Sequence, residues 1–113
     1  MMMIRFPVLK IILSVVIYDQ VIVDFYATWC PPCRSCAVPF GQMSEEYSAK
    51  GWIFAKVDVT EAKDVAFRAD VSQMPTFKVY VKGTEIQKFV GFQPGNIKEL
   101  LDGQKPPETK KAE

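Results

Sequence analysis

The sequence VIVDFYATWCPPCRSC, residues 21–36, decides how the rest of the chain is interpreted. Its first five residues are an apolar, β-branched and aromatic run interrupted by one carboxylate, Asp24, as expected for a strand covered on both faces. A short bend follows, and Cys30 and Cys33 then enclose two prolines. A buried strand that leads into a helix beginning with thiols predicts redox chemistry, because the helix N-terminus favours a thiolate over a thiol.

The two cysteines are predicted to have different roles in thiol–disulfide exchange. Cys30 should lie just outside the helix, exposed to a partner, and attack a disulfide, whereas Cys33 lies in the first turn and resolves the mixed disulfide. Pro31 precedes a second proline, which disfavours the helical region for it, so the helix is predicted to begin near Pro32. The helix should run to about residue 50, where Gly51 ends it.

The composition indicates one globular domain in a reducing compartment. A chain of 113 residues, of which 49% are hydrophobic, is long enough for one core. Its net charge of +1 and the lack of a basic stripe give no reason to expect nucleic acid as a partner. Histidine is absent, which excludes Cys–His and Ser–His nucleophile pairs and imidazole metal ligands. An odd number of cysteines, three within seven positions, does not form a disulfide framework.

Downstream of the motif, the hydrophobic pattern alternates between strands and helices. Strands are predicted at residues 52–59, 76–82 and 84–90, and helices at residues 61–69 and 94–101. Thr60 is the predicted N-cap of the first of these helices, and Gly83 the predicted hairpin turn. Residues 103–113 are proline-rich and charged, so we expect a disordered tail after a single domain of residues 1–102.

The N-terminal segment has two interpretations. Residues 3–6 are predicted to form a first strand and residues 7–18 a first helix, with Pro7 near its start. The same apolar run after a positive residue also resembles the core of a signal peptide. It is too short to span a membrane, and no small-x-small cleavage site follows it. We therefore expect it to belong to the domain, with secretory or organellar targeting as the alternative.

Taken together, these features resemble the thioredoxin family over roughly residues 3–102. Met74-Pro75-Thr76 resembles the cis-proline turn that the family places across from its active-site cysteines, and Gly91 falls at a close backbone approach. The resemblance implies an α/β three-layer fold, with a central mixed sheet of about five strands and about four flanking helices. It also implies a reversible Cys30–Cys33 disulfide, in a chain that needs no cofactor.

Two further residues beneath the cysteines are assigned roles. Asp24 lies in an apolar strand, where an unpaired carboxylate is costly, so we expect a raised pKa and a role as proton acceptor for Cys33. Lys56 resembles the family's lysine that accompanies this acid and is expected to modulate it. The alternative is an ordinary ion pair between Asp24 and Lys56.

A substrate-binding surface is also predicted around the motif. Trp29 and Pro75 should form its apolar contact area, and a cis bond before Pro75 would let the backbone of Met74 pair with a substrate strand. The full set of predicted contact residues is Trp29, Pro31, Pro32, Met74, Pro75 and Gly91.

The third cysteine, Cys36, does not fit this scheme. A C-x-x-C-x-x-C spacing hints at an iron–sulfur site, but the fourth cysteine is missing and no histidine is present for zinc, so we expect no metal. Cys36 is interpreted as a small, half-buried residue, with a regulatory thiol as the alternative.

The resemblance implies a thioredoxin-type protein-disulfide reductase. It would receive electrons from a flavin-dependent thioredoxin reductase, act on disulfide-containing client proteins, and work as a cytoplasmic monomer. The Cys-Pro-Pro-Cys motif leaves open a tryparedoxin-like enzyme or a CPPC reductase of the membrane or secretory pathway. A non-catalytic adaptor with the same fold is a further alternative, although both cysteines are intact.

Overall fold

The computed structural model describes residues 4–5 and 17–104, in which five strands form one mixed sheet. The strands in spatial order are β1 (Ile4–Arg5), β3 (Ile53–Asp58), β2 (Gln20–Tyr26), β4 (Thr76–Val81) and β5 (Thr84–Val90). The pairs β1–β3 and β3–β2 are parallel, and the pairs β2–β4 and β4–β5 are antiparallel. β2, which leads into the cysteines, therefore lies at the centre of the sheet.

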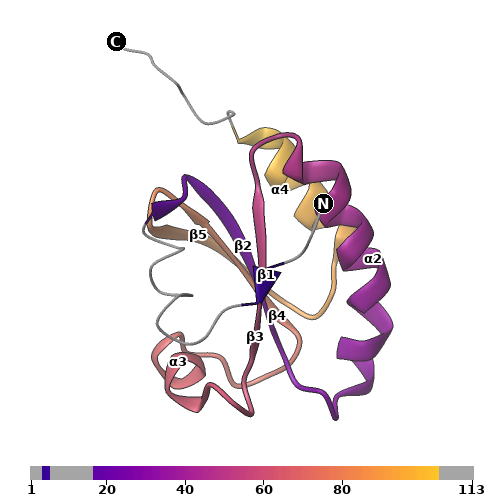
Figure 1. The fold of residues 1–113 in the computed structure, drawn as a ribbon, viewed down its shortest axis with the longest axis vertical. Helices are drawn as coiled ribbons and strands as arrows, with labels where there is room; N and C mark the ends of the chain where they lie inside the picture. Colours follow the sequence, from indigo (N-terminus) through magenta and orange to yellow (C-terminus); the bar gives the residue numbers. More distant parts are fainter. Residues whose placement is uncertain (1–3, 6–16, 105–113) are drawn as a thin grey trace.

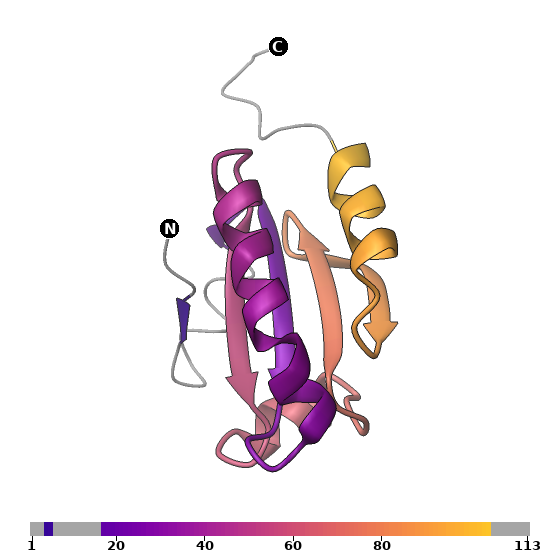
Figure 2. The ribbon, with the colours of Figure 1, turned by 90° about the vertical axis from the view of Figure 1, so that its right-hand side faces the viewer.

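Helices cover both faces of this sheet. The helices α2 (Pro31–Ser48) and α4 (Pro94–Gly103) lie side by side on one face, while α3 (Lys63–Arg68) packs on the other (Figures 1 and 2). The predicted three-layer α/β class is confirmed. The strand expected at residues 3–6 is present as β1, but nearly all of the helix expected at residues 7–18 lies outside the described residues.

The two faces of β2 contribute to two different cores. Val21, Val23 and Phe25 pack in the cluster that includes residues of α3. Ile22 packs in the larger cluster beneath α2 and α4. Because neighbouring residues of a strand point to opposite faces, Asp24 points toward the α2 side with Ile22. Both faces of β2 are therefore covered by apolar clusters, which is why its sequence is almost continuously apolar.

Aromatic packing fixes α2 on the sheet and thereby fixes the cysteines at its start. The ring of Phe40 lies 5.1 Å from that of Phe54 and 5.0 Å from that of Phe77, both measured between centroids. Such pairs contribute about 0.5–1.5 kcal/mol each beyond the burial of their area. The helix is thus anchored to β3 and β4 by one side chain.

The ends of α2 differ in how well they were predicted. The helix begins at Pro31 rather than Pro32, with Cys30 as its N-cap. The error has a physical reason: the first positions of a helix need no intrahelical N–H bond, so proline is well tolerated there. At the other end, Gly51 has φ 93° and donates to Ser48 O, while Trp52 N–H donates to Tyr47 O. This is a Schellman motif, and the predicted glycine stop is confirmed.

The predicted start of α3 is wrong. Its N-cap is Ala62, which makes no side-chain capping bond, and the helix covers only Lys63–Arg68 instead of residues 61–69. Thr60 has other partners: its N–H donates to Asp58 Oδ1 and its hydroxyl accepts from Trp29. Residues 58–61 therefore form a turn that precedes the helix.

The hairpin of β4 and β5 is tight. Lys82 and Gly83 both have positive φ, 52° and 83°, which matches the twist of the flanking strands. β5 is an edge strand, and its register with β4 shifts between Val79 and Tyr80. Of its side chains, only that of Phe89 is buried.

The last helix among the described residues is α4, and the predicted domain boundary at residue 102 stays a prediction. α4 continues to Gly103, with Ile97 and Leu101 buried against the sheet and Leu100 half-buried. The tail predicted at residues 103–113 lies, from residue 105 onward, outside the described residues.

Candidate active site

A disulfide joins Cys30 and Cys33 where β2 passes into α2. Cys30 is the N-cap of the helix, and its sulfur accepts a hydrogen bond of 3.2 Å from the backbone N–H of Cys33. The Cα atoms of the two residues are 5.2 Å apart. An N-cap acceptor faces the positive end of the helix dipole, so a thiolate formed on Cys30 would be stabilised here.

Both cysteines are buried, contrary to the prediction that Cys30 is exposed. The exposed fractions are 4% for Cys30 and 5% for Cys33. They pack with Tyr26 and Ala27, and Met74, in the bend before β4, packs against them. Exposure therefore does not distinguish an attacking from a resolving sulfur in this disulfide-bonded state. The two sulfurs do differ in hydrogen bonding, because the Cys30 sulfur accepts from the start of the helix.

The turn before β4 lies directly against this disulfide. The Met74–Pro75 peptide bond is cis, as the family resemblance implies. The carbonyl oxygen of Met74 lies 3.6 Å from the Cys30 sulfur. Two bonds hold the turn: Gly91 N–H donates to Pro75 O at 2.7 Å, and the Thr76 hydroxyl donates to Gln73 O at 2.6 Å.

Gly91 approaches the backbone of Pro75 closely through its N–H, but this approach is not what requires a glycine here. A Cβ atom built on it would meet nothing within 4 Å. Its φ is 84°, in the left-handed region that side chains disfavour. The glycine is therefore required by the backbone conformation that directs its N–H toward Pro75.

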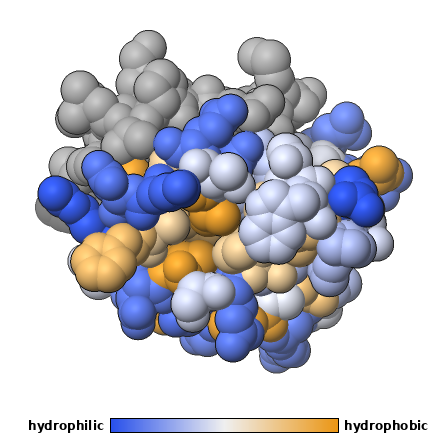
Figure 3. Space-filling model, turned by 90° about the horizontal axis from the view of Figure 1, so that it is seen from below, coloured by the Kyte–Doolittle hydropathy of each residue, from blue (hydrophilic) through white to orange (hydrophobic). Residues whose placement is uncertain are grey.

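Of the residues predicted to form an apolar contact surface, the tryptophan and the two prolines of the motif are exposed and Pro75 is not. Trp29 is 62% exposed, and its indole N–H donates to the hydroxyl of Thr60 at 3.3 Å. Pro31 and Pro32 are exposed beside it, whereas Pro75 is buried and only backbone groups of that turn are close to the sulfur. Figure 3 views the molecule from the end at which α2 begins, and apolar groups lie there among hydrophilic ones.

Asp24 and Lys56 lie beneath α2 as register partners on β2 and β3. Asp24 is 2% exposed, and its Oδ1 has no hydrogen-bond partner. Burial raises the pKa of this carboxyl to about 7, against a partial lowering by the charge of Lys56. The prediction of a raised pKa agrees with this environment. The Lys56 ammonium lies 4.3 Å from the centroid of the Tyr26 ring.

Cys36 is a fully buried residue of the main core, not a half-buried one. Its exposed fraction is 3%, and its thiol donates to Cys33 O at 3.4 Å. Burial, followed by the charge of Asp24, raises the pKa of the thiol to about 11. Cys36 is therefore a neutral thiol near neutral pH. Among the described residues, no three His, Cys, Asp or Glu side chains gather closely enough to hold a metal ion.

The contacts of three polar side chains were not predicted from the sequence. Thr60 supports Trp29, Arg34 donates from its guanidinium to Thr28 O at 3.1 Å, and Lys78 is buried in β4. Lys78 could have been identified from the sequence, because it interrupts the apolar run TFKVYV as Asp24 interrupts VIVDFY. The other two depend on loop geometry that no pattern in the chain reveals.

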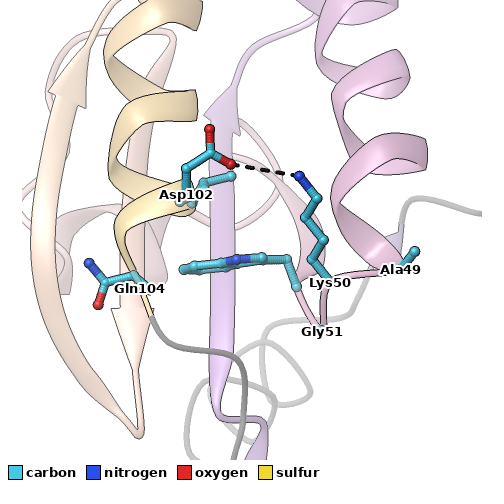
Figure 4. A pocket seen from close by; sticks show the side chains of 7 residues that line it. Ala49, Lys50, Gly51, Asp102 and Gln104 are labelled. Carbon is cyan, nitrogen blue, oxygen red and sulfur yellow. Dashed lines mark ion pairs between the residues drawn. The ribbon is translucent and has the colours of Figure 1, made fainter.

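A pocket of about 520 Å³ lies at the far end of α2 from the cysteines (Figure 4). It is bordered by the ion pair of Lys50 and Asp102, with Nζ and Oδ1 3.7 Å apart. The hydroxyl of Tyr47 also donates to Asp102 at 2.9 Å. These contacts tie the ends of α2 and α4 together, and the pocket contributes nothing to the cysteine site.

Comparisons with known proteins agree on one family. A family model described as thioredoxin matches residues 13–103. Thioredoxin from Coprinus comatus and thioredoxin-2 from Saccharomyces cerevisiae are each 44% identical over 81 residues, which cover 72% of this chain and 76% of theirs. The solution structure of oxidised thioredoxin from Plasmodium falciparum has a TM-score of 0.80 and 30% identity, covering 89% of this chain and 96% of that one. Within residues 4–5 and 17–104, each helix is too short or too polar to span a bilayer.

Proposed function

This chain belongs to the thioredoxin family of thiol–disulfide oxidoreductases, and on that premise we propose that it is a protein-disulfide reductase working through its Cys-Pro-Pro-Cys motif. One observation carries the proposal. The Cys30–Cys33 disulfide lies at the N-terminus of α2, with the Met74 carbonyl oxygen 3.6 Å from the Cys30 sulfur. A reactive sulfur beside a backbone acceptor suits a substrate that is itself a polypeptide.

In the first step, the reduced protein attacks a client disulfide. The Cys30 thiolate, stabilised by the Cys33 N–H and the helix dipole, attacks one sulfur of the client. A bond forms between Cys30 and that sulfur, the client S–S bond breaks, and the other client sulfur leaves as a thiolate that takes up a proton. The client backbone pairs with Met74, and its side chains contact the exposed Trp29, Pro31 and Pro32.

In the second step, Cys33 releases the client. Its thiol loses a proton toward the carboxylate of Asp24, whose pKa of about 7 suits a proton acceptor near neutral pH. The Cys33 thiolate then attacks the Cys30 sulfur, the Cys30–Cys33 disulfide forms, and the second client sulfur leaves as a thiolate. Lys56 lowers the Asp24 pKa from the still higher value that burial alone would produce. The client has gained two electrons, which the Cys pair has lost.

Each cycle ends with an oxidised Cys pair, so an external reductant is required. We assign this role to a flavin-dependent thioredoxin reductase, which returns two electrons to the pair by the same exchange chemistry. The chain itself carries no resident cofactor in this scheme. It acts as a cytoplasmic monomer, which suits a reductase that meets many clients and one electron donor.

Insulin reduction tests the proposal. The reduced full chain should reduce insulin, and NADPH with a thioredoxin reductase should sustain turnover. Insulin reduction with dithiothreitol but never with the reductase would favour the tryparedoxin-like or membrane-associated CPPC reductase. A chain that leaves insulin intact with every reductant, although its own disulfide is opened, would be an adaptor and would overturn the proposal.

A further inference from the structure

Lys78 is a buried lysine on the face of β4 opposite to the α2 face, and the reaction scheme above does not use it. Only 5% of its side chain is exposed. Placing an ammonium inside a sheet is unfavourable unless its charge and its hydrogen-bond donors are satisfied. Two partners do this: the carboxylate of Glu85 on β5, 2.8 Å away, and the carbonyl oxygen of Ala69. The bond to Ala69 satisfies a second donor of the ammonium and also joins β4 to the end of α3.

The contact with Ala69 adds to two backbone bonds that close the end of α3, from Asp70 N–H to Phe67 O and from Val71 N–H to Ala66 O. Ala69 is the C-cap of this helix, where carbonyl groups lack intrahelical partners and attract a cation. The next residue, Asp70, adopts φ 59° and turns the chain away from the helix. On β5, Lys88 stands directly opposite Lys78 and donates to Asp70 O at 3.4 Å. Two lysines from neighbouring strands thus hold consecutive carbonyls.

The segment that begins at this point ends at the disulfide. Residues 70–74 lead from Asp70 to Met74, whose carbonyl oxygen lies 3.6 Å from the Cys30 sulfur. The far end of the segment is held by Thr76, which donates to Gln73 O at 2.6 Å. Lys78 and Thr76 are on the same strand and on the same face of it, so β4 fixes the segment at both ends.

We propose that Lys78 is a positioning residue, which holds residues 70–74 so that the Met74 backbone is correctly placed for a client polypeptide beside Cys30. The proposal deepens the reductase function and rests on it, because the client is what pairs with Met74. Lys78 does not touch the reacting sulfurs. Its loss should therefore weaken the recognition of protein disulfides and leave the intrinsic reactivity of Cys30 unchanged.

Two variants separate the two contacts of Lys78. Lys78→Met removes both the ion pair and the bond to Ala69 O, whereas Glu85→Gln removes the ion pair alone. The reduced full-length variants are assayed with insulin and with a small aromatic disulfide, dithiobis(nitrobenzoate), which has no backbone to pair. For Lys78→Met we expect kcat/KM with insulin to fall about tenfold, mainly through KM, as for a misplaced binding group. Its rate with the small disulfide should remain within roughly twofold of wild type, and Glu85→Gln should match wild type in both assays.

Three results would overturn the inference. An unchanged insulin KM in Lys78→Met removes the positioning role, and an equal loss with the small disulfide assigns the effect to Cys30 itself. An equal loss of kcat/KM with insulin in Glu85→Gln assigns the effect to the ion pair and not to the bond with Ala69. If Lys78→Met does not fold, Thr76→Val removes the bond that holds the other end of the same segment. That variant must then show the same loss of kcat/KM with insulin and no loss with the small disulfide. A wild-type chain inactive on insulin would instead refute the reductase function.

Discussion

Asp24 and Lys56 face each other across two neighbouring parallel strands, yet none of the ion pairs among the described residues joins them. The Lys56 ammonium lies over the ring of Tyr26 instead. The carboxylate of Asp24 is thereby left in an apolar environment, where burial outweighs the attraction of the lysine and raises its pKa to about 7. The ordinary ion pair that the sequence left open as an alternative is not formed.

Replacing this carboxylate should stabilise the protein above neutral pH. The folded-state pKa of Asp24 is about 7 and its ordinary value is 3.8, so folding favours the protonated form. Its contribution to stability is fully present below about pH 4 and is lost as the pH rises toward 7. The loss is on the order of 4 kcal/mol, from the difference of about three pKa units. Asp24→Asn should therefore unfold at higher urea concentration than wild type at pH 8.

The pH dependence provides the control for that experiment. The advantage of Asp24→Asn should shrink steadily as the pH falls from 8 to 4, because the wild-type carboxyl becomes protonated. Equal unfolding midpoints at pH 8 would show that Asp24 is stabilised by a partner and not penalised by burial.

The same variant should slow the release of a client. If Asp24 accepts the proton of Cys33, Asp24→Asn should reduce single-turnover resolution of a mixed disulfide about 10²-fold, at the lower end for general-base catalysis. Wild-type resolution should rise with pH through about 7, the Asp24 pKa, and the variant should lack this rise. Attack by Cys30 should be little changed. Normal resolution at pH 8 in the variant would remove Asp24 from the mechanism.

The roles of the two cysteines can be separated by trapping. Cys33→Ser should accumulate covalent adducts between Cys30 and client proteins, because the thiol that resolves the mixed disulfide is gone and Cys36 is buried in the core. Cys30→Ser should accumulate none, since neither Cys33 nor Cys36 occupies the N-cap position that stabilises a thiolate. Non-reducing electrophoresis after incubation with insulin measures both. Adducts in Cys30→Ser alone would reverse the assignment.

Cys36 should be dispensable for turnover and slow to react. Its buried thiol, with a pKa of about 11, should resist alkylation by iodoacetamide in the folded protein at pH 7 and react only after denaturation. Cys36→Ser should keep nearly wild-type insulin reduction while losing about 1–3 kcal/mol of stability, because it places a hydroxyl in the core. A loss of turnover as large as that of Cys30→Ser would make Cys36 catalytic.

Trp29 should contribute to protein substrates only. Its exposed indole offers an apolar contact that a client can bury, and tryptophan is enriched among the few interface residues whose truncation costs about 2 kcal/mol or more. Trp29→Ala should therefore raise the KM for insulin at least roughly fivefold and leave the reaction with dithiobis(nitrobenzoate) unchanged. Thr60→Val, which removes only the support of the indole N–H, should have a smaller effect. Equal losses with both disulfides would contradict a contact role.

The sequence predicted the parts of this structure that depend on local pattern. The buried central strand, the glycine stop at Gly51 and the hairpin at Gly83 follow from hydrophobic runs and backbone freedom, which are properties of short segments. The burial of Cys30 was missed because Met74 covers it, and that contact joins residues 44 positions apart. The wrong cap at Thr60 has the same cause, since the hydroxyl accepts from Trp29. Contacts between distant loops leave no periodic signal in the chain.

The outer edge of β5 affects the tendency of the protein to aggregate at high concentration. An edge strand can pair with another chain and seed aggregation, and natural sequences prevent this with charges and irregular register. Here Lys88 lies between Ile86 and Val90, which are 38% and 45% exposed, and the register with β4 shifts nearby. Replacing Lys88 by valine would create a continuous apolar edge. The same lysine that holds Asp70 would thus also keep the protein colloidally stable.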